Sequence, residues 1–293
     1  MSGKHGIVCM GLLMLLSSCH DDKQVTASGL QRKDFQTEVN GQYTDLFTLS
    51  NKKGMEVCIT NYGARVVSIL VPDKNGKRED VVCGFSTIGE YMEQRQNFGS
   101  TVGRYIGRIL NARFTLDGVE HKLVPNNGKS GHISHGGNPG FADRIWKVEQ
   151  ADTYTVRLSY LSPDGENGFP GNLKVTLVYS LGEDENALDL TYEATTDAPT
   201  VLNLSHHSFF NISGDFTKSV EDPPERRKTH AEESWAQTSE QPAGVCQAAQ
   251  QNLQLEAQHY LSLVSNSTIK EQFPRLVRGS FYLVHKVVPI KNK

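Results

Sequence analysis

The chain has 293 residues and a formal net charge of −3 at pH 7, and this length suits one large domain. Its positive and negative charges are mixed, which excludes the basic footprint of a nucleic-acid-binding protein. Cys58, Cys83 and Cys246 form a sparse, odd set after the N-terminal region. Such a set argues against a disulfide framework, and we expect apolar filler side chains or free thiols.

The N-terminus has the pattern of a secretory signal. A short basic start precedes an apolar run over residues 7–16, which is too short to span a membrane. The run ends in Leu-Ser-Ser-Cys, which resembles a bacterial lipobox, with Cys19 as the lipidated first residue of the mature protein. An ordinary signal peptide with an incidental cysteine is the alternative. We expect a lipoprotein signal over residues 1–19 and a polar tether over residues 20–36.

From about Thr37 to Val201, short β-branched or apolar runs alternate with tight turns. Alternation with period two buries one face of an antiparallel sheet and exposes the other. Asp117-Gly118 lies between two such runs and indicates a hairpin. No long amphipathic helix intervenes, so the pattern predicts an all-β fold, a large antiparallel β-sandwich. The expected strands are 47–49, 57–60, 66–71, 114–116, 122–124, 156–160, 174–179 and 188–192.

The composition changes near Asp222. Residues 223–228 are charged and contain prolines, and residues 237–258 are rich in Gln and Ala. This part is a solvated insertion, a helix, or sequence that no longer belongs to the fold. Strand character returns over residues 281–288.

Two segments place histidines among small or turn-forming residues, at 131–137 and 203–211. Histidine has the side-chain pKa closest to neutrality, so it suits proton transfer at physiological pH. No nucleophile motif accompanies these segments. The pattern indicates acid–base chemistry on a neutral substrate.

Four segments together resemble the aldose 1-epimerase (galactose mutarotase) family in order and spacing. The resemblance runs from about Thr37 to Gly214 and implies a galactose mutarotase-like supersandwich over residues 37–293. It also implies interconversion of the α and β anomers of free hexoses such as glucose and galactose, without a cofactor or a metal. The four segments are Asn61–Arg65, Val102–Ile109, Asn126–Gly128 leading to His135-Gly136-Gly137, and Asn203–Asn211.

The chain departs from the family pattern at about residues 215–253. The family has a long middle section there, with an aspartate that binds sugar hydroxyls and has no counterpart in this chain. The chain therefore resembles a mutarotase without several core strands. Unpaired sheet edges would make it less stable than a full-length relative and leave little turnover. A catalytically impaired or inactive sugar-binding relative is the alternative function.

The resemblance implies a role for each of four residues. Glu256, in a stretch similar to that of the family's catalytic glutamate, is the base, and His207 is the acid. His135 hydrogen-bonds near the ring oxygen, and Arg108 holds sugar hydroxyls through its planar donor fork. Simpler interpretations stay open, since His135 also suits a turn and Glu256 a solvated helix.

His206 and His207 are adjacent, so on a strand their side chains point to opposite faces, and we expect only His207 in the site. Arg104 is expected to form a structural ion pair. His132 and His135 lack further ligands, so we expect no metal site. We expect a monomer in the bacterial cell envelope (periplasm or outer membrane), with an aldose sugar as partner, no nucleic acid, and membrane contact only through the lipid anchor.

Overall fold

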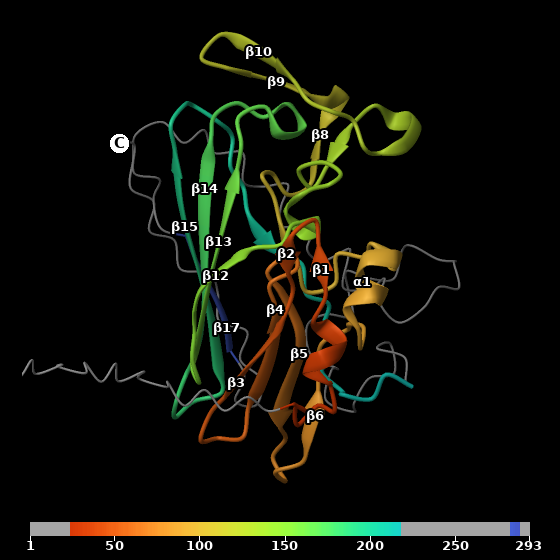
Figure 1. Ribbon diagram of the computed structural model, residues 1–293, viewed down its shortest axis with the longest axis vertical. Coiled ribbons are helices and arrows are strands. Elements are labelled where there is room, and N and C mark those ends of the chain that lie inside the picture. Colours follow the sequence, from red (N-terminus) through yellow and green to blue (C-terminus); the bar gives the residue numbers. More distant parts are fainter. Residues whose placement is uncertain (1–23, 218–281, 288–293) are drawn as a thin grey trace, which may run out of the picture.

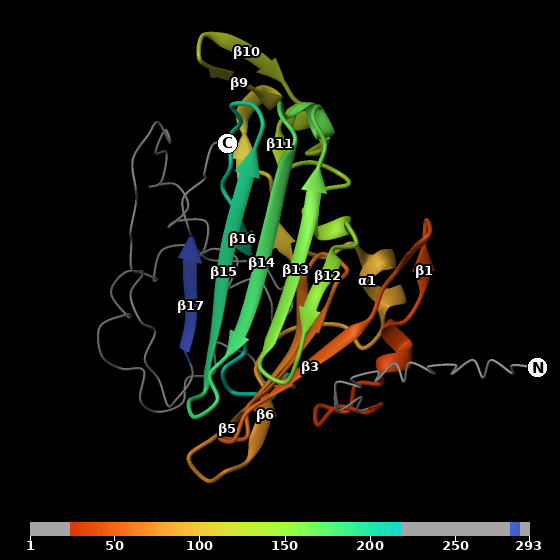
Figure 2. The same cartoon turned by 60° about the vertical axis from the view of Figure 1, so that its left-hand side comes forward.

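The computed structural model describes residues 24–217 and the strand β17 (Tyr282–Val287). Two β-sheets face each other and form a sandwich (Figure 1). The larger sheet has the order β12-β13-β14-β15-β17, with its strands side by side in Figure 2. The smaller has the order β3-β4-β5-β6. Their bounds are β3 Leu46–Ser50, β4 Glu56–Thr60, β5 Arg65–Pro72, β6 Arg78–Asp80, β12 Lys147–Ala151, β13 Thr155–Ser162, β14 Leu173–Leu181 and β15 Ala187–Thr196.

The core lies between the two sheets. On β14 the apolar residues recur at every second position, and Val175, Leu177 and Tyr179 have no exposed surface. They belong to one cluster with Val57 and Ile59 of the facing sheet. The two-residue period therefore gives each sheet one apolar face, and burying both faces against each other removes them from water.

The prediction of an all-β, largely antiparallel sandwich is confirmed, with one difference in strand direction. β15 pairs with β17 in parallel, with Ala187 opposite Tyr282 and Tyr192 opposite Val287. The sequence pattern identified a strand at this place but not its direction, because alternation is the same in parallel and antiparallel pairs. Unpaired sheet edges were expected in general, and over these residues the edge of β15 has a partner.

The other elements flank the sandwich. The hairpin at Asp117-Gly118 is present, although its second strand begins earlier than expected. A short helix, α1 (Ile88–Gln94), was not expected; Thr87 and Glu90 form a capping box that starts it. The remaining strands are β1 Glu38–Val39, β2 Gln42–Tyr43, β7 Thr101–Val102, β8 Arg108–Ile109, β9 Arg113–Leu116, β10 Val119–Lys122, β11 Ile133–Ser134 and β16 Ser205–His206. The 3₁₀ helices are η1 Arg32–Phe35, η2 Leu110–Ala112, η3 Gly128–Ser130, η4 Phe141–Asp143 and η5 Glu166–Gly168.

The tether expected over residues 20–36 is wrong for its described part, because residues 24–36 pack on the sandwich. Phe35 is fully buried. The backbone N–H of Ala27 donates to the buried carboxylate of Glu56 at 2.7 Å. Arg32 binds both carboxylate oxygens of Asp45, at 2.8 and 2.6 Å. The polar composition of residues 20–36 is typical of a linker. Composition alone does not show that some of these polar groups form fixed hydrogen bonds with the sandwich.

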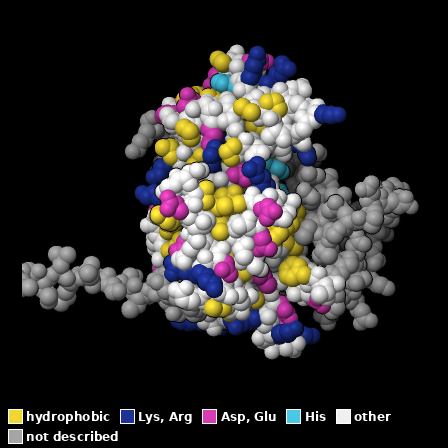
Figure 3. Space-filling model, turned by 45° about the vertical axis from the view of Figure 1, so that its right-hand side comes forward, with side chains coloured by type: hydrophobic (Ala, Val, Ile, Leu, Met, Phe, Trp, Pro, Cys, Tyr) yellow, Lys and Arg dark blue, Asp and Glu magenta, His cyan; other side chains and the backbone are white. Residues whose placement is uncertain are grey.

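The surface and the cysteines agree with a globular β domain. On the face drawn in Figure 3, acidic and basic side chains are interspersed. Over residues 24–217 and 282–287, no helix is long and apolar enough to cross a membrane. Cys58 and Cys83 are buried, and burial raises the pKa of the Cys58 thiol to about 12. Cys246 lies outside the described residues.

Candidate active site

Two histidines that are far apart in the chain lie in contact at the ends of two short strands. The ring centroids of His135 and His207 are 5.2 Å apart, with their planes at 88°. His135 directly follows β11, which pairs with β8. His207 directly follows β16, which pairs with β7. The two strand pairs therefore position the imidazoles of His135 and His207 next to each other.

Two hydrogen bonds to the Gly107 backbone fix the position of His135. Its N–H donates to the Gly107 carbonyl at 2.8 Å, and its Nδ1 accepts from the Gly107 N–H at 3.2 Å. His135 has a φ of 52°, in the left-handed region that few residues other than glycine adopt. Since Nδ1 is an acceptor, the proton of the neutral ring is on Nε2, which is then a hydrogen-bond donor.

Two asparagines hold the strand and loop around His135. Asn126 forms two hydrogen bonds with the Ser134 backbone: its Nδ2 donates to the carbonyl at 3.0 Å, and its Oδ1 accepts from the N–H at 2.6 Å. Asn167 donates from Nδ2 to the carbonyls of Gly136 and Pro139, both at 2.9 Å. Asn126 belongs to a segment that the sequence identified. Asn167 was missed, because it comes from a distant turn whose local sequence indicates only a turn.

His207 is held by its backbone and packed by an aromatic ring. Its N–H donates to the Ser100 carbonyl at 2.7 Å, and its carbonyl accepts from the Gly99 N–H at 3.1 Å. Its ring lies 5.0 Å from that of Phe209. Within the described part of the chain, His207 Nδ1 is buried and has no hydrogen-bond partner. A buried polar atom without a partner is costly, so this nitrogen is suited to bind an incoming polar group.

Burial keeps both rings neutral near pH 7. It lowers the pKa of His135 to about 4, and the neighbouring His207 and Arg108 act in the same direction. Burial also lowers the pKa of His207, and the positive charge of Arg65 contributes. Desolvation disfavours the charged imidazolium, and a nearby cation repels it.

The low pKa of His135 predicts a loss of stability in mild acid. The unfolded chain takes up a proton near pH 6.5, whereas the folded chain does so only near pH 4. The contribution of this neutral ring is therefore present above about pH 6.5 and is lost as the pH falls towards 4, by up to about 3 kcal/mol. Urea unfolding at pH 7.5 and 5 should show this, and His135→Asn should reduce the difference. An equal pH dependence in both proteins would contradict it.

Arg108 and Arg104 have different surroundings. Arg108 is exposed on β8 opposite Ser134, and its charge acts on His135. Arg104 is buried, with 1% of its surface exposed. The structural ion pair expected for Arg104 is not what holds it, because its hydrogen bonds go to neutral oxygens. These acceptors are Ser162 Oγ, Thr200 Oγ1 and the carbonyls of Ser162, Pro163, Pro170 and Gly171.

The other candidate residues lie apart from the pair or outside the described chain. His206 is buried, with its ring 6.0 Å from that of Tyr179 and its Nδ1 3.1 Å from Ser208 Oγ. His132 Nδ1 accepts from the Asn111 N–H at 3.0 Å. In residues 24–217, no group of three His, Cys, Asp or Glu side chains is arranged to hold a metal ion. Glu256 and Cys19 are outside the described residues.

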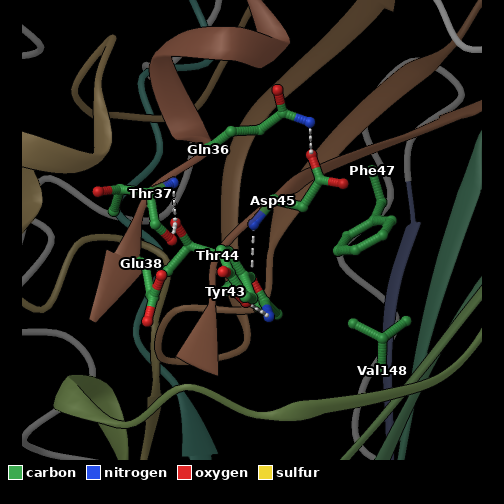
Figure 4. Close-up of a pocket in the computed structure, with 9 residues that line it drawn as sticks. Gln36, Thr37, Glu38, Tyr43, Thr44, Asp45, Phe47 and Val148 are labelled. Atoms are coloured by element: carbon green, nitrogen blue, oxygen red, sulfur yellow. Dashed lines mark hydrogen bonds between the residues drawn. The ribbon is translucent and has the colours of Figure 1, made fainter. Parts of the chain in front are cut away.

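A hollow of about 580 Å³ has neither His135 nor His207 in its lining (Figure 4). Several of its polar groups bind one another: Gln36 donates to Asp45 at 3.1 Å, and Asn61 accepts from the Asp45 N–H at 2.9 Å. These bonds attach the β1–β2 hairpin to the smaller sheet. We therefore assign the polar groups of this hollow a structural role and not a ligand-binding one. It is lined by Gln36, Thr37, Glu38, Tyr43, Thr44, Asp45, Phe47, Asn61 and Val148.

A two-sheet sandwich with paired histidines at its strand ends defines a class of all-β proteins, that of galactose mutarotase-like folds. An aldose epimerase homologue from Caenorhabditis elegans matches with a TM-score of 0.55 and 34% identity, over 57% of this chain and 51% of that one. The galactose 1-epimerase of Lactobacillus acidophilus matches with a TM-score of 0.53 and 32% identity, over 60% and 52%. A sequence profile described as aldose 1-epimerase matches residues 45–260. The chain therefore belongs to the aldose 1-epimerase family.

Curated relatives match over part of their length. The aldose 1-epimerase of Escherichia coli K12 is 36% identical over 176 residues, which is 60% of this chain and 50% of the relative. The galactose mutarotase of Sus scrofa is 38% identical over 168 residues, 57% and 48%. The chain thus spans about half the length of the relatives it matches.

Proposed function

We propose that this protein is an aldose 1-epimerase that interconverts the α and β anomers of free hexoses, glucose and galactose among them. The single observation that supports this most is the contact between His135 and His207, with ring centroids 5.2 Å apart, in a chain of this family. Both rings are neutral near pH 7, so they can meet an uncharged sugar by hydrogen bonding and proton transfer.

The reaction is a reversible ring opening. A base, proposed to be Glu256, removes the proton of the anomeric hydroxyl while His207 gives a proton to the ring oxygen. The bond from the anomeric carbon to the ring oxygen breaks, and an open-chain aldehyde forms. Rotation about the neighbouring carbon–carbon bond and return of both protons close the other anomer.

The surroundings of His135, His207 and Arg108 suit these roles. His135 Nε2–H can donate to the ring oxygen and hold it beside His207. A lowered pKa makes the His207 imidazolium a minor species at neutral pH but a stronger acid when it forms. Arg108 is exposed, so its guanidinium fork can reach sugar hydroxyls.

The test is polarimetry of freshly dissolved α-D-galactose with the full chain at pH 7. We expect the rate of optical change to exceed that of buffer and to rise in proportion to protein concentration. A rate equal to buffer, with a folded protein, would overturn the proposal. It would favour the alternative, an inactive sugar-binding relative. The match to only half the length of the relatives supports that alternative. Calorimetric titration with galactose would detect that binding.

We also propose that the protein is a lipid-anchored monomer of the bacterial cell envelope, where it would meet sugars before or during uptake. The apolar run that ends at Cys19 supports this. Cys19→Ala should release the protein from the membrane fraction or leave it unprocessed. Cys246→Ala is the control and should stay membrane-bound. Wild-type protein that is wholly soluble and carries no lipid by mass spectrometry would refute the anchor.

A further inference from the structure

Arg65 is a buried cation at the start of β5, between the segments that carry the two histidines. Only 1% of its surface is exposed, and within the described chain it forms no ion pair with a carboxylate. Its guanidinium instead donates to three backbone carbonyls. Nη1 donates to Gln96 at 2.8 Å and to Phe98 at 2.7 Å, and Nη2 donates to Ala142 at 3.1 Å.

The first two carbonyls belong to a segment that contacts the neighbours of His207. The Phe98 ring lies 5.2 Å from that of Phe209, which in turn lies 5.0 Å from His207. The next residue, Gly99, donates its N–H to the His207 carbonyl at 3.1 Å. Fixing residues 96–98 therefore also restrains His207, through the Gly99 hydrogen bond to its backbone and through the Phe98 and Phe209 rings beside its imidazole.

The third carbonyl belongs to the segment that supports the His135 loop. Ala142 lies in η4, and its neighbour Phe141 donates its N–H to the Gly103 carbonyl at 3.4 Å. That carbonyl is so close to Gly136 that a Cβ there would lie 1.8 Å from its oxygen. A Cβ on Gly140 would lie 3.1 Å from the carbonyl oxygen of His135 itself. One guanidinium thus binds two segments, one of which contacts the surroundings of His207 and the other those of His135.

Aromatic rings complete the enclosure of this cation. The Arg65 Cζ lies 4.5 Å from the ring centre of Tyr91 and 5.6 Å from that of Tyr62. A buried charge is costly unless dipoles or ring faces compensate it. Three carbonyls and two ring faces do so here, and a planar fork is the cation that can reach all three carbonyls at once.

We propose that Arg65 is a positioning residue for the histidine pair, bridging the 96–98 segment beside His207 to the 141–142 segment beside His135. Its consequence for turnover rests on the proposed function, whereas its effect on the two imidazoles does not. Among the described residues, the groups whose charge or titration acts on the pair are His135 and His207 themselves, Arg108 on β8 and Arg65 on β5.

The test compares Arg65→Met with Arg65→Lys in the full chain without sugar. Imidazole resonances followed against pH should show His207 of Arg65→Met titrating at higher pH than in wild type, because a repelling charge is lost. Amide hydrogen exchange should accelerate at both Gly99 and Phe141, on the two sides of the bridge. Arg65→Lys retains the charge but spans fewer carbonyls, so it should keep the His207 titration closer to wild type while exchange accelerates.

Arg104→Met is the matched control, because Arg104 is also a buried arginine that binds carbonyls, those of residues 162, 163, 170 and 171. It should destabilise the fold without moving the His207 titration. A folded Arg65→Met with wild-type titration and wild-type exchange at Gly99 and Phe141 would overturn the proposal. If Arg65→Met does not fold, unchanged exchange at both amides in Arg65→Lys would overturn it instead.

Turnover gives the second, separable measurement. A small misplacement of reacting groups typically costs about 10²-fold in rate, so kcat of Arg65→Met should fall by about that factor, with KM changing less. Arg65→Lys should recover part of it. If the wild type turns over no sugar, the proposed function fails, yet the titration and exchange results still decide the role of Arg65.

Discussion

His207→Ala is expected to slow the anomerisation of fresh α-glucose or α-galactose by about 10²-fold or more, the scale on which a positioned acid contributes. The variant removes the ring that contacts His135 and the buried Nδ1 that has no partner within the described chain. Without it, the imidazole proposed to give a proton to the ring oxygen is lost. Polarimetry under first-order conditions measures the effect.

His132→Ala is the control for this experiment, because His132 comes from the same segment as His135 but binds the Asn111 backbone instead. It should keep a rate close to that of wild type. Circular dichroism and a cooperative unfolding transition must show that both variants are folded. An unchanged rate in folded His207→Ala would remove His207 from the mechanism.

Gly136→Ala is expected to destabilise the fold by more than about 3 kcal/mol, among the largest effects of a single substitution. Gly136 has a φ of 82°, and its added Cβ would lie 1.8 Å from the Gly103 carbonyl oxygen. Two atoms cannot approach this closely, so the loop that carries His135 must move away from Gly103, which directly follows β7. Urea unfolding measures the stability, and the ring resonance of His135 reports the displacement.

Gly76→Ala separates backbone strain from the clash. Gly76 has a φ of 81°, and apart from Gly76 itself and its two chain neighbours no residue has an atom within 4 Å of an added Cβ. It should cost about 1–2 kcal/mol, the strain of a left-handed conformation alone. If the two variants lose equal stability, the close approach of Gly136 to Gly103 is not what requires glycine there.

Local patterns were sufficient to predict most of the strands that form the sandwich, although β6 and β12 were not among the expected ones. Residues 174–179 alternate apolar and polar side chains, and β14 (Leu173–Leu181) buries the apolar set. Asp117-Gly118 indicated the hairpin of β9 and β10, because a tight turn is determined by its own residues. The histidine segments were found for the same reason, since their histidines lie among small or turn-forming residues that are close in the chain.

Contacts between distant segments decided the rest. The parallel direction of β17, the packing of residues 24–36 and the contact of His135 with His207 depend on the tertiary arrangement. Alternation has no direction, and a polar segment does not show which buried carboxylate its amides will find.

The arginines show the difference between the two kinds of information. Arg108 was identified because it lies in a motif, and the structure places its charge near His135. Arg65 also lies in a motif, but its sequence neighbours say nothing of the carbonyls at residues 96, 98 and 142 that it binds. The sequence by itself determined most of the sandwich strands, the Asp117-Gly118 turn and the motif histidines, since these depend on residues close in the chain. Only the tertiary structure decided which backbone oxygens surround each buried cation, because those oxygens come from segments that folding brings together.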